Sequence, residues 1–302
     1  MRVLITGASG FMGSWTIENL MQDLVFGTDR NAPEGSMLYR SDLTHYEEVL
    51  NTFHHFMPDA VIHLGAVTGA TGENEMEQSL RQAYRNFEVN AMGTTNVCEA
   101  MRVTGVKKLI YASSFATYGR TDPDRLPIDE NTGVDLHHAY ANSKYAGELV
   151  VRTYAEDFGF KSAIFRLPFV VGEHQKEKNA LREFINAAEK GESLDVYGDG
   201  SQLRTFIHAL DVVSAFDKTL NVIDDIGTKP VLFVLGNTPV SMLHLAEMVI
   251  EKVGSGSVKF VESSRAFSQF SDYTKAMQTL GWTPTIGIQE IISRMVESDR
   301  VK

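Results

Sequence analysis

Two side chains with complementary chemistry lie four positions apart in the segment Tyr140-Ala-Asn-Ser-Lys144. On a helix, residues at i and i+4 project from the same face, so the phenol of Tyr140 and the ammonium of Lys144 would face one site. A phenol titrates at about pH 10, and a nearby positive charge lowers its pKa by favouring the phenolate. The pair therefore predicts a general base that can remove a proton from a hydroxyl group.

Ser113 and Ser114 place hydroxyl groups at the end of an expected strand, Lys108–Ser113. In parallel α/β sheets, ligands bind outside the carboxyl ends of the strands. Ser114 beside Tyr140 can therefore hold the substrate oxygen. A Tyr and a Lys at this spacing are also typical of a helix with one core and one surface residue. The glycine-rich turn upstream favours the chemical interpretation.

That turn spans residues 7–13, follows the first expected strand and opens the first expected helix. Its spacing is G-x-x-G-x-x-G. Gly7 permits a tight turn, Gly10 lets a pyrophosphate approach the backbone, and Gly13 lets the helix pack closely on the sheet. The N–H groups at the helix start then face the anion, helped by the helix dipole. The turn predicts a dinucleotide site, although a glycine turn without a ligand is the alternative.

Asp29 ends the second expected strand, at about the 20-residue spacing from Gly7 that a ribose-binding acid shows. Its carboxylate would accept from both ribose hydroxyls and repel a 2′-phosphate, which favours NAD over NADP. Arg30 can hold that phosphate, so NADP stays open. Asp42 and Leu43 are expected to flank the adenine, and the alternative for Asp42 is an N-cap of the following helix.

Short apolar runs alternate with amphipathic stretches over the first two-thirds of the chain. This alternation predicts an α/β protein with a Rossmann-type, doubly wound, mainly parallel sheet and a smaller C-terminal α/β substrate lobe. The expected strands are Val3–Thr6, Leu24–Thr28, Met37–Tyr39, Ala60–Leu64, Lys108–Ser113, Ser162–Leu167, Thr205–His208 and Val231–Leu235. The expected helices are Met12–Met21, Tyr46–His55, Met76–Arg102, Ala139–Asp157, Asn179–Lys190, Asp211–Leu220, Ser241–Val253 and Ile288–Val296.

The regular alternation ends after Leu167, which suggests a division of the chain. We expect residues 1–167, with returning segments at about 205–236, to form the NAD-binding Rossmann domain. Residues 168–204 and 237–302 are expected to form the substrate-binding lobe. The cleft between the two is the expected site.

The composition excludes several classes of protein. The chain has 302 residues, of which 43% are hydrophobic and 22% are charged, so it is not a disordered, collagen-like or disulfide-rich protein. The net charge of −11 argues against nucleic-acid partners and anionic membranes. No apolar run reaches the roughly 18 residues that span a bilayer. The first residues have the pattern of a strand rather than a secretory signal, so we expect a cytoplasmic protein.

The cysteine and histidine residues favour structural roles. Cys98 is the single cysteine; it cannot form an internal disulfide, and its apolar surroundings predict core packing. The histidine pairs His54-His55 and His137-His138 consist of neighbours that point apart on a helix, with no carboxylate cluster beside them. We therefore predict no metal site.

Taken together, these motifs resemble the extended short-chain dehydrogenase/reductase family, in particular its NAD-dependent nucleotide-sugar epimerases and dehydratases, and the pattern is most similar to the UDP-galactose 4-epimerase group. The residues that carry the resemblance extend over nearly the whole chain. They are Gly7–Gly13, Asp29, His63–Ala66, Asn90–Thr94, Ser113-Ser114, Tyr118-Gly119, Tyr140 with Lys144, Arg166–Pro168, Tyr197–His208 and Leu280–Pro284.

The resemblance implies a role for individual residues. The implied catalytic residues are Ser114, Tyr140 and Lys144. The residues implied to bind NAD are Gly7, Gly10, Phe11, Met12, Gly13, Asp29, Arg30, Asp42, Leu43, Leu64, Gly65, Ala66, Asn90, Ser113, Tyr140, Lys144 and Pro168. The residues implied to bind the nucleotide-diphosphate sugar are Ser114, Tyr140, Phe169, Tyr197, Arg204 and Arg265, with Arg204 on the diphosphate. A homodimer through the helices near Met76–Arg102 and Ala139–Asp157 is also implied.

The implied reaction is NAD-dependent epimerisation, at C4 of a UDP-glucose/UDP-galactose type substrate, through a transient 4-keto sugar. Dehydratases and decarboxylases of the family have an acid just after the Ser/Thr, where this chain has Phe115 and Ala116. An NAD(P)H-dependent reductase of a keto-sugar nucleotide or another carbonyl is one alternative, and a non-catalytic dinucleotide-binding protein is another. Phe169 stands where many relatives have an Asn, Arg265 is a candidate for a missing C-terminal arginine, and the loop Thr68–Gln78 has no assigned role.

Overall fold

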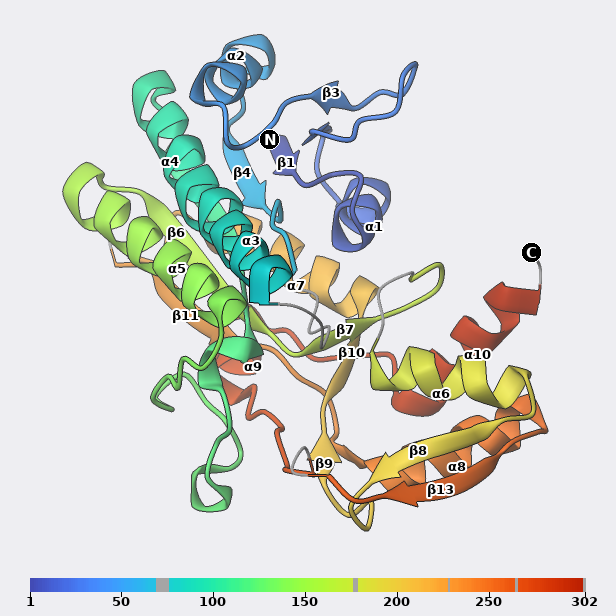
Figure 1. The fold of residues 1–302 in the computed structure, drawn as a ribbon. Helices are drawn as coiled ribbons and strands as arrows, with labels where there is room; N and C mark the ends of the chain where they lie inside the picture. Colours follow the sequence, from blue (N-terminus) through green and yellow to red (C-terminus); the bar gives the residue numbers. More distant parts are fainter. Residues whose placement is uncertain (69–75, 176–178, 228, 264–265, 301–302) are drawn as a thin grey trace.

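The structure, a computed structural model, describes residues 1–68, 76–175, 179–227, 229–263 and 266–300, and the side chains of these except residues 76–80. Its centre is a seven-stranded sheet in the order β11-β6-β5-β4-β1-β2-β3, with every neighbouring pair parallel (Figure 1). The bounds are β1 Arg2–Thr6, β2 Leu24–Asp29, β3 Tyr39–Arg40, β4 Ala60–His63, β5 Lys108–Ser114, β6 Lys161–Leu167 and β11 Val231–Val234. The predicted fold class is confirmed.

Helices cover both faces of this sheet. Alternate residues of each strand point to opposite faces, so Val3 and Ile5 of β1 join one buried cluster while Leu4 joins the other. Helices α1 Phe11–Asn19, α7 Ala209–Val222 and α9 Thr274–Leu280 pack on the first face. Helices α2 Tyr46–Phe56, α4 Gly93–Thr104 and α5 Ala139–Phe158 pack on the second. Cys98 of α4 is fully buried in that second cluster, as its apolar neighbours predicted.

The stretch predicted as one helix over Met76–Arg102 is interrupted. It consists of α3 Met76–Phe87, a π-helical turn Glu88–Met92 and α4, which begins at Gly93. The turn buries Asn90, whose side-chain amide donates to the backbone oxygen of Val67 at 3.0 Å and accepts from the Val67 N–H at 2.8 Å. The apolar periodicity continues through a wider turn, so it could not reveal this interruption. Such turns are often found at functional sites.

Another buried cluster, separate from the two on the faces of the central sheet, lies beyond β6. It is formed by short strands and three helices. The strand β7 Phe169–Val171 pairs with β10 Phe206–His208, β8 Ser193–Tyr197 with β13 Ser257–Val261, and β9 Leu203–Arg204 with β12 Val240–Ser241. The helices are α6 Ala180–Glu189, α8 Met242–Val253 and α10 Ile288–Arg300. We predicted these helices with shifted ends and did not predict β8 and β13, whose polar residues alternate with only two buried ones, Leu194 and Val196.

The helix α9 departs from the predicted boundary of the lobe. Ala276, Leu280 and the buried Trp282 join the cluster of the central sheet, and the Trp282 indole N–H donates to the Asp211 backbone oxygen of α7 at 2.9 Å. This segment was expected in the substrate lobe because it follows residue 236. We propose that the clusters on the two faces of the central sheet are otherwise the core of the predicted cofactor domain, and that the cluster beyond β6 is the core of the predicted substrate lobe.

Within the described ranges, no helix is both long enough and apolar enough to cross a bilayer. The same residues contain no group of three or more His, Cys, Asp or Glu side chains arranged to hold a metal ion. His137 instead pairs with Asp135 at 2.6 Å, and His138 caps α5 by accepting from the Ala141 N–H at 3.3 Å.

Candidate active site

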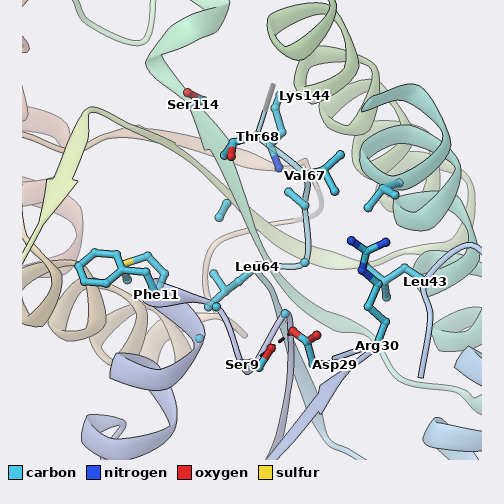
Figure 2. Close-up of a pocket in the computed structure, with 18 of the residues that line it drawn as sticks. Ser9, Phe11, Asp29, Arg30, Leu43, Leu64, Val67, Thr68, Ser114 and Lys144 are labelled. Atoms are coloured by element: carbon cyan, nitrogen blue, oxygen red, sulfur yellow. Dashed lines mark hydrogen bonds between the residues drawn. The ribbon is translucent and has the colours of Figure 1, made fainter. Parts of the chain in front are cut away.

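A cleft of about 510 Å³ lies at the carboxyl ends of the central strands (Figure 2). Its size is within the range of small-molecule and cofactor sites. Most of the residues predicted to bind the cofactor line it together, and Ser114 and Gln175 line it as well. These predicted residues are Gly7, Gly10, Phe11, Met12, Gly13, Asp29, Arg30, Asp42, Leu43, Leu64, Gly65, Ala66, Ser113, Tyr140, Lys144 and Pro168.

The glycine-rich turn forms one wall, and its glycines are required by close backbone contacts. Gly7 has a φ of +72°, and a Cβ there would lie 2.6 Å from the Gly65 Cα. A Cβ on Gly13 would overlap the Gly7 carbonyl oxygen. The helix α1 begins after Gly10 with no side-chain cap and no acidic residue in its first turn. Its uncapped N-terminus thus faces the cleft and fits the pyrophosphate of a dinucleotide.

Asp29 lies where β2 ends and touches the glycine-rich turn. Its carboxylate accepts from the Ser9 N–H at 3.2 Å and from the Asn31 N–H at 2.8 Å; Figure 2 shows the first of these bonds. A carboxylate has about four acceptor positions, so this one keeps capacity for ribose hydroxyls. Arg30 lines the same end of the cleft. The residues present therefore fit NAD. Arg30 could also bind the 2′-phosphate of NADP, so binding measurements with both cofactors would test the preference for NAD.

Asp42 and Leu43 lie at the same end, on the segment between β3 and α2. The Asp42 carboxylate accepts from the N–H of Thr44 at 2.9 Å and from its hydroxyl at 2.8 Å. The N-cap of α2 is His45, so the alternative role of Asp42 as that cap is wrong: its side chain closes the turn one step earlier. The Leu43 backbone oxygen accepts from the Asn96 amide of α4 at 2.8 Å, which fixes this wall.

Ser114, Tyr140 and Lys144 lie at the other end of the cleft. Figure 2 shows Ser114 and Lys144 opposite Asp29 and Ser9. Ser114 ends β5, and Tyr140 and Lys144 lie one turn apart at the start of α5. Lys144 is only 3% exposed, and its Nζ lies 4.4 Å from the ring centroid of Tyr111. The structure thus brings together the three residues predicted to be catalytic.

The pKa of Tyr140 differs from the sequence-based expectation. Burial raises it, and the hydrogen bond with Ser114 acts in the opposite direction. Burial also lowers the pKa of Lys144 to about 7, against the opposing effect of the Glu148 carboxylate. The expectation counted the positive charge of Lys144 but not the loss of solvent at both groups. Groups of the protein alone therefore leave Tyr140 as a phenol at neutral pH.

Glu148 and Arg166 are residues of this region that the sequence analysis did not assign to the site. Glu148 is completely buried on α5, and Arg166 of β6 binds it with two hydrogen bonds of 2.9 and 2.8 Å. Ser113 donates its hydroxyl to the same carboxylate at 2.5 Å. The signal that could have found Glu148 is its spacing, one helical turn after Lys144.

Asn90 was predicted to bind the cofactor, but it does not line the cleft. Its side chain instead holds both backbone groups of Val67 and donates to the Ser143 hydroxyl at 3.0 Å. Val67 and Thr68 do line the cleft. Asn90 therefore contacts the wall from behind. Of the loop Thr68–Gln78, residues 69–75 lie outside the described residues.

The residues predicted to bind only the substrate do not line this cleft. Phe169 is partly exposed and stacks on Phe206 with ring centroids 5.6 Å apart, and Tyr197 is 37% exposed at the end of β8. Arg204 donates to the backbone oxygens of Phe267 and Leu203, and its guanidinium lies 4.3 Å from the Phe267 ring centroid. Arg265 lies outside the described residues.

Three comparisons show which known proteins this chain is similar to. Residues 3–236 match the family described as "NAD dependent epimerase/dehydratase family". A UDP-glucuronate 4-epimerase of Thermodesulfobacterium geofontis is 26% identical and aligns with 97% of this chain and 94% of its own length. A dTDP-D-glucose 4,6-dehydratase of Mus musculus is 27% identical over 98% of this chain and 88% of its own.

Among solved structures, the UDP-glucose 4-epimerase of Thermus thermophilus in complex with NAD has a TM-score of 0.84 and 27% identity. The match covers 99% of each chain. The likeness in fold therefore extends over the central sheet and the segments beyond β6. The relatives include both epimerases and dehydratases, so the residues of the cleft have to distinguish the two reactions.

Proposed function

This chain belongs to the NAD-dependent epimerase/dehydratase family, and from that premise we propose that it epimerises a nucleotide-diphosphate sugar, with UDP as the nucleotide and C4 as the reacting carbon. The observation that carries the proposal is the arrangement within one cleft. The glycine-rich turn and Asp29 line one end, and Ser114, Tyr140 and Lys144 line the other. A dinucleotide held at the first end extends its nicotinamide towards the second.

Bound NAD supplies reversible acceptance of a hydride from the sugar. Tyr140 removes the proton from the 4-hydroxyl and returns it, and Ser114, which hydrogen-bonds Tyr140, orients the same oxygen. Lys144 lines the same end of the cleft, and its ammonium form favours the phenolate over the phenol. Because burial raises the pKa of Tyr140, the positive charges of Lys144 and of the bound nicotinamide are needed to make this phenol a base near neutral pH.

The residues after Ser114 support epimerisation over dehydration. Ser114 is followed by a short 3₁₀ helix, Phe115–Tyr118, in which Phe115 is buried and Ala116 has no proton to give. The Ala116 N–H donates to the Ser114 hydroxyl oxygen at 3.1 Å. Elimination of a sugar hydroxyl requires a general acid near C6, and neither side chain can serve.

Arg204 supports a substrate that carries a diphosphate. Its guanidinium is largely out of solvent, which lowers its pKa to about 10. Among the described residues, no carboxylate forms an ion pair with it. Its partners are the backbone oxygens of Leu203 and Phe267 and the Phe267 ring. A buried cation without a counter-charge is costly unless an anion binds it. We therefore propose that Arg204 binds the substrate diphosphate, because the planar guanidinium can donate paired hydrogen bonds to phosphate oxygens.

The experiment is incubation of the purified protein, without added reduced cofactor, with UDP-glucose, UDP-galactose, UDP-glucuronate and the N-acetyl forms. We expect one pair of C4 epimers to interconvert to an equilibrium mixture. The proposal is wrong if no member of the panel interconverts. Stoichiometric consumption of added NADH or NADPH would instead identify a reductase, because an epimerase regenerates its own cofactor.

We also propose that the protein is a cytoplasmic homodimer. Large apolar side chains are exposed on neighbouring elements on one side of the sheet: Tyr84 of α3 is 72% exposed, Met92 after it 57% and Leu149 of α5 49%. Figure 1 shows α3 and α4 following one another end to end, with α5 running alongside them. Apolar surface on adjacent helices is typical of an interface. The single, buried Cys98 fits a reducing compartment.

A further inference from the structure

A buried carboxylate lies one helical turn below the lysine of the site. Glu148 is on α5 four residues after Lys144, and its side chain has no exposed surface. Its two oxygens accept from Nε and Nη2 of Arg166, at 2.9 and 2.8 Å, and one of them also accepts from the Ser113 hydroxyl at 2.5 Å. These bonds join α5 to the ends of β5 and β6, the three elements that line the catalytic end of the cleft.

The hydrogen bonds of Glu148 fix its position. Arg166 is paired with it in a two-pronged geometry and also lies over the Tyr118 ring, 4.7 Å from the centroid. Guanidinium groups stay charged in proteins, so Arg166 supplies a counter-charge to the buried carboxylate. Arg166 and Ser113 thus hold Glu148 in one place in the interior.

The groups that face Lys144 can be named element by element. Tyr111 of β5 presents its ring 4.4 Å from Nζ, and His63 of β4 is buried and neutral, since burial and the charge of Lys144 lower its pKa to about 3. On α5 itself, Tyr140 precedes Lys144 and Glu148 follows it. Within the described part of the chain, Glu148 is the one anion found to act on Lys144.

We propose that Glu148 is a positioning residue, which keeps Lys144 protonated and fixed on the floor of the cleft so that it can act as an ammonium. Arg166 and Ser113 hold the carboxylate in place for this purpose. The inference rests on the proposed function in one respect, namely that the ammonium form of Lys144 is the active one. Its electrostatic part concerns the protein alone and can be tested without substrate.

The first test follows the titration of Lys144 directly. The side-chain nitrogens of lysine are labelled with ¹⁵N, the Lys144 signal is assigned by its loss in Lys144→Arg, and its pKa is measured in the parent and in Glu148→Gln. The parent value is expected near 7. Removing the adjacent anion disfavours the charged form, so the pKa should fall by about one unit or more. An unchanged pKa overturns the proposal.

The second test measures kcat against pH on the sugar nucleotide that the parent converts. Below the lowered pKa, both proteins hold Lys144 as ammonium, and their kcat values should converge. Above about pH 8, the Glu148→Gln variant should be slower by about tenfold or more. A fall of about one unit in the Lys144 pKa lowers the fraction of Lys144 in the ammonium form by that factor. A defect by one constant factor at every pH would indicate a merely structural role and contradict the proposal.

Three further variants keep these tests decisive. Glu148→Asp retains the charge and should restore most of the Lys144 pKa. Asp299→Asn breaks a comparable, mostly buried ion pair with Arg182 in the other cluster, and it should lower stability without moving the Lys144 pKa. If Glu148→Gln does not fold, Glu148→Gln combined with Arg166→Gln avoids the unpaired cation. The Lys144 pKa should again fall, because Glu148 is the member of that pair that acts on Lys144. Should the pKa shift be found while no sugar nucleotide is converted, the function fails and the electrostatic inference stands.

Discussion

Tyr140 and Lys144 both lose solvent in the fold, and for each the loss opposes the charged form that the reaction needs. Burial raises the pKa of the phenol and lowers that of the ammonium. Glu148 counters the second effect, and the hydrogen bond from Ser114 counters the first. The charge state of Tyr140 and Lys144 in the free protein therefore depends on Ser114 and Glu148, and each of these can be removed by a single substitution.

Replacement of Tyr140 by phenylalanine removes the proton acceptor and keeps the ring. We expect kcat to fall by about 10²- to 10⁴-fold, the usual contribution of a general acid or base. NAD binding should stay close to that of the parent, because the adenosine end of the cleft is untouched. Steady-state kinetics with calorimetric titration of NAD measures both. Turnover near the parent value would show that another group is the base.

Replacement of Arg204 by glutamine tests the proposed diphosphate contact. Loss of charge-assisted hydrogen bonds should raise the KM for the sugar nucleotide by about 10- to 100-fold with a smaller change in kcat. Arg120 is the matched control: it is exposed and lies farther from the same Phe267 ring, at 5.6 Å. If Arg204→Gln and Arg120→Gln have equal effects on KM, the specific role of Arg204 is refuted.

At the scale of elements, the turn between β1 and α1 is set by backbone contacts that leave no room for side chains. A Cβ on Gly13 would overlap the Gly7 oxygen and lie 2.6 Å from the Ala8 Cα, whereas a Cβ on Gly10 would meet only the Gly7 oxygen, at 3.2 Å. The backbone of Gly10 has a φ of −75°, which suits alanine. The two positions should therefore fail in different ways.

We expect Gly13→Ala to lower the free energy of unfolding by about 1–3 kcal/mol through overpacking, and to weaken NAD binding as α1 shifts. Gly10→Ala should leave stability nearly unchanged and still weaken NAD binding, because its Cβ stands where the pyrophosphate approaches. Thermal unfolding and NAD titration separate the two effects. Gly287→Ala, where a Cβ meets nothing within 4 Å, is the control, and equal behaviour of all three variants would contradict this account of the turn.

The sequence predicted the central sheet well because β1, β4, β5 and β6 are buried on both faces and consist of unbroken apolar runs. It failed where the pattern carries no such signal. The wider turn at Glu88–Met92 keeps the apolar periodicity, β8 exposes every other residue, and β13 has no buried residue. The weak strand expected at Met37–Tyr39 is a two-residue pairing at Tyr39–Arg40.

The candidate site shows the same division. Spacing along the chain was enough to predict that the glycine turn, Asp29 and the Tyr140–Lys144 pair line one cleft, because each follows a short local rule. It was not enough to single out Glu148, because its hydrogen-bond partners Arg166 and Ser113 lie on two other elements. The pKa directions also depend on burial, which the order of residues does not give.

At the scale of the whole molecule, we propose that the site is shared between the central sheet with its helices and the hydrophobic cluster beyond β6. The glycine turn, Asp29 and the catalytic residues belong to the first, whereas Arg204 lies in β9 of the second region. Substrate anchoring and chemistry are thus proposed to reside on different parts of the chain. This separation would let an intermediate sugar turn while its diphosphate stays bound.

The proposed dimer is also a property of the whole molecule. Leu149→Glu places a charge in the exposed apolar surface of α5, and we expect it to convert a dimer to a monomer because a charge buried without a partner is unfavourable. Sedimentation equilibrium measures the outcome. Met57→Glu, at a residue more exposed than Leu149 and beyond the end of α2, should leave the mass unchanged. A parent protein that is already monomeric at micromolar concentration would contradict the dimer.

The central claim is that the hydrogen at C4 of the sugar leaves and returns within one closed site. The most direct measurement uses UDP-galactose deuterated at C4, converted by the purified protein in ordinary water, with mass spectrometry of the product. We predict UDP-glucose that retains the deuterium at C4, with no net change in added cofactor. Loss of the deuterium to solvent, or product that forms only as added NADH or NADPH is consumed, would contradict the account.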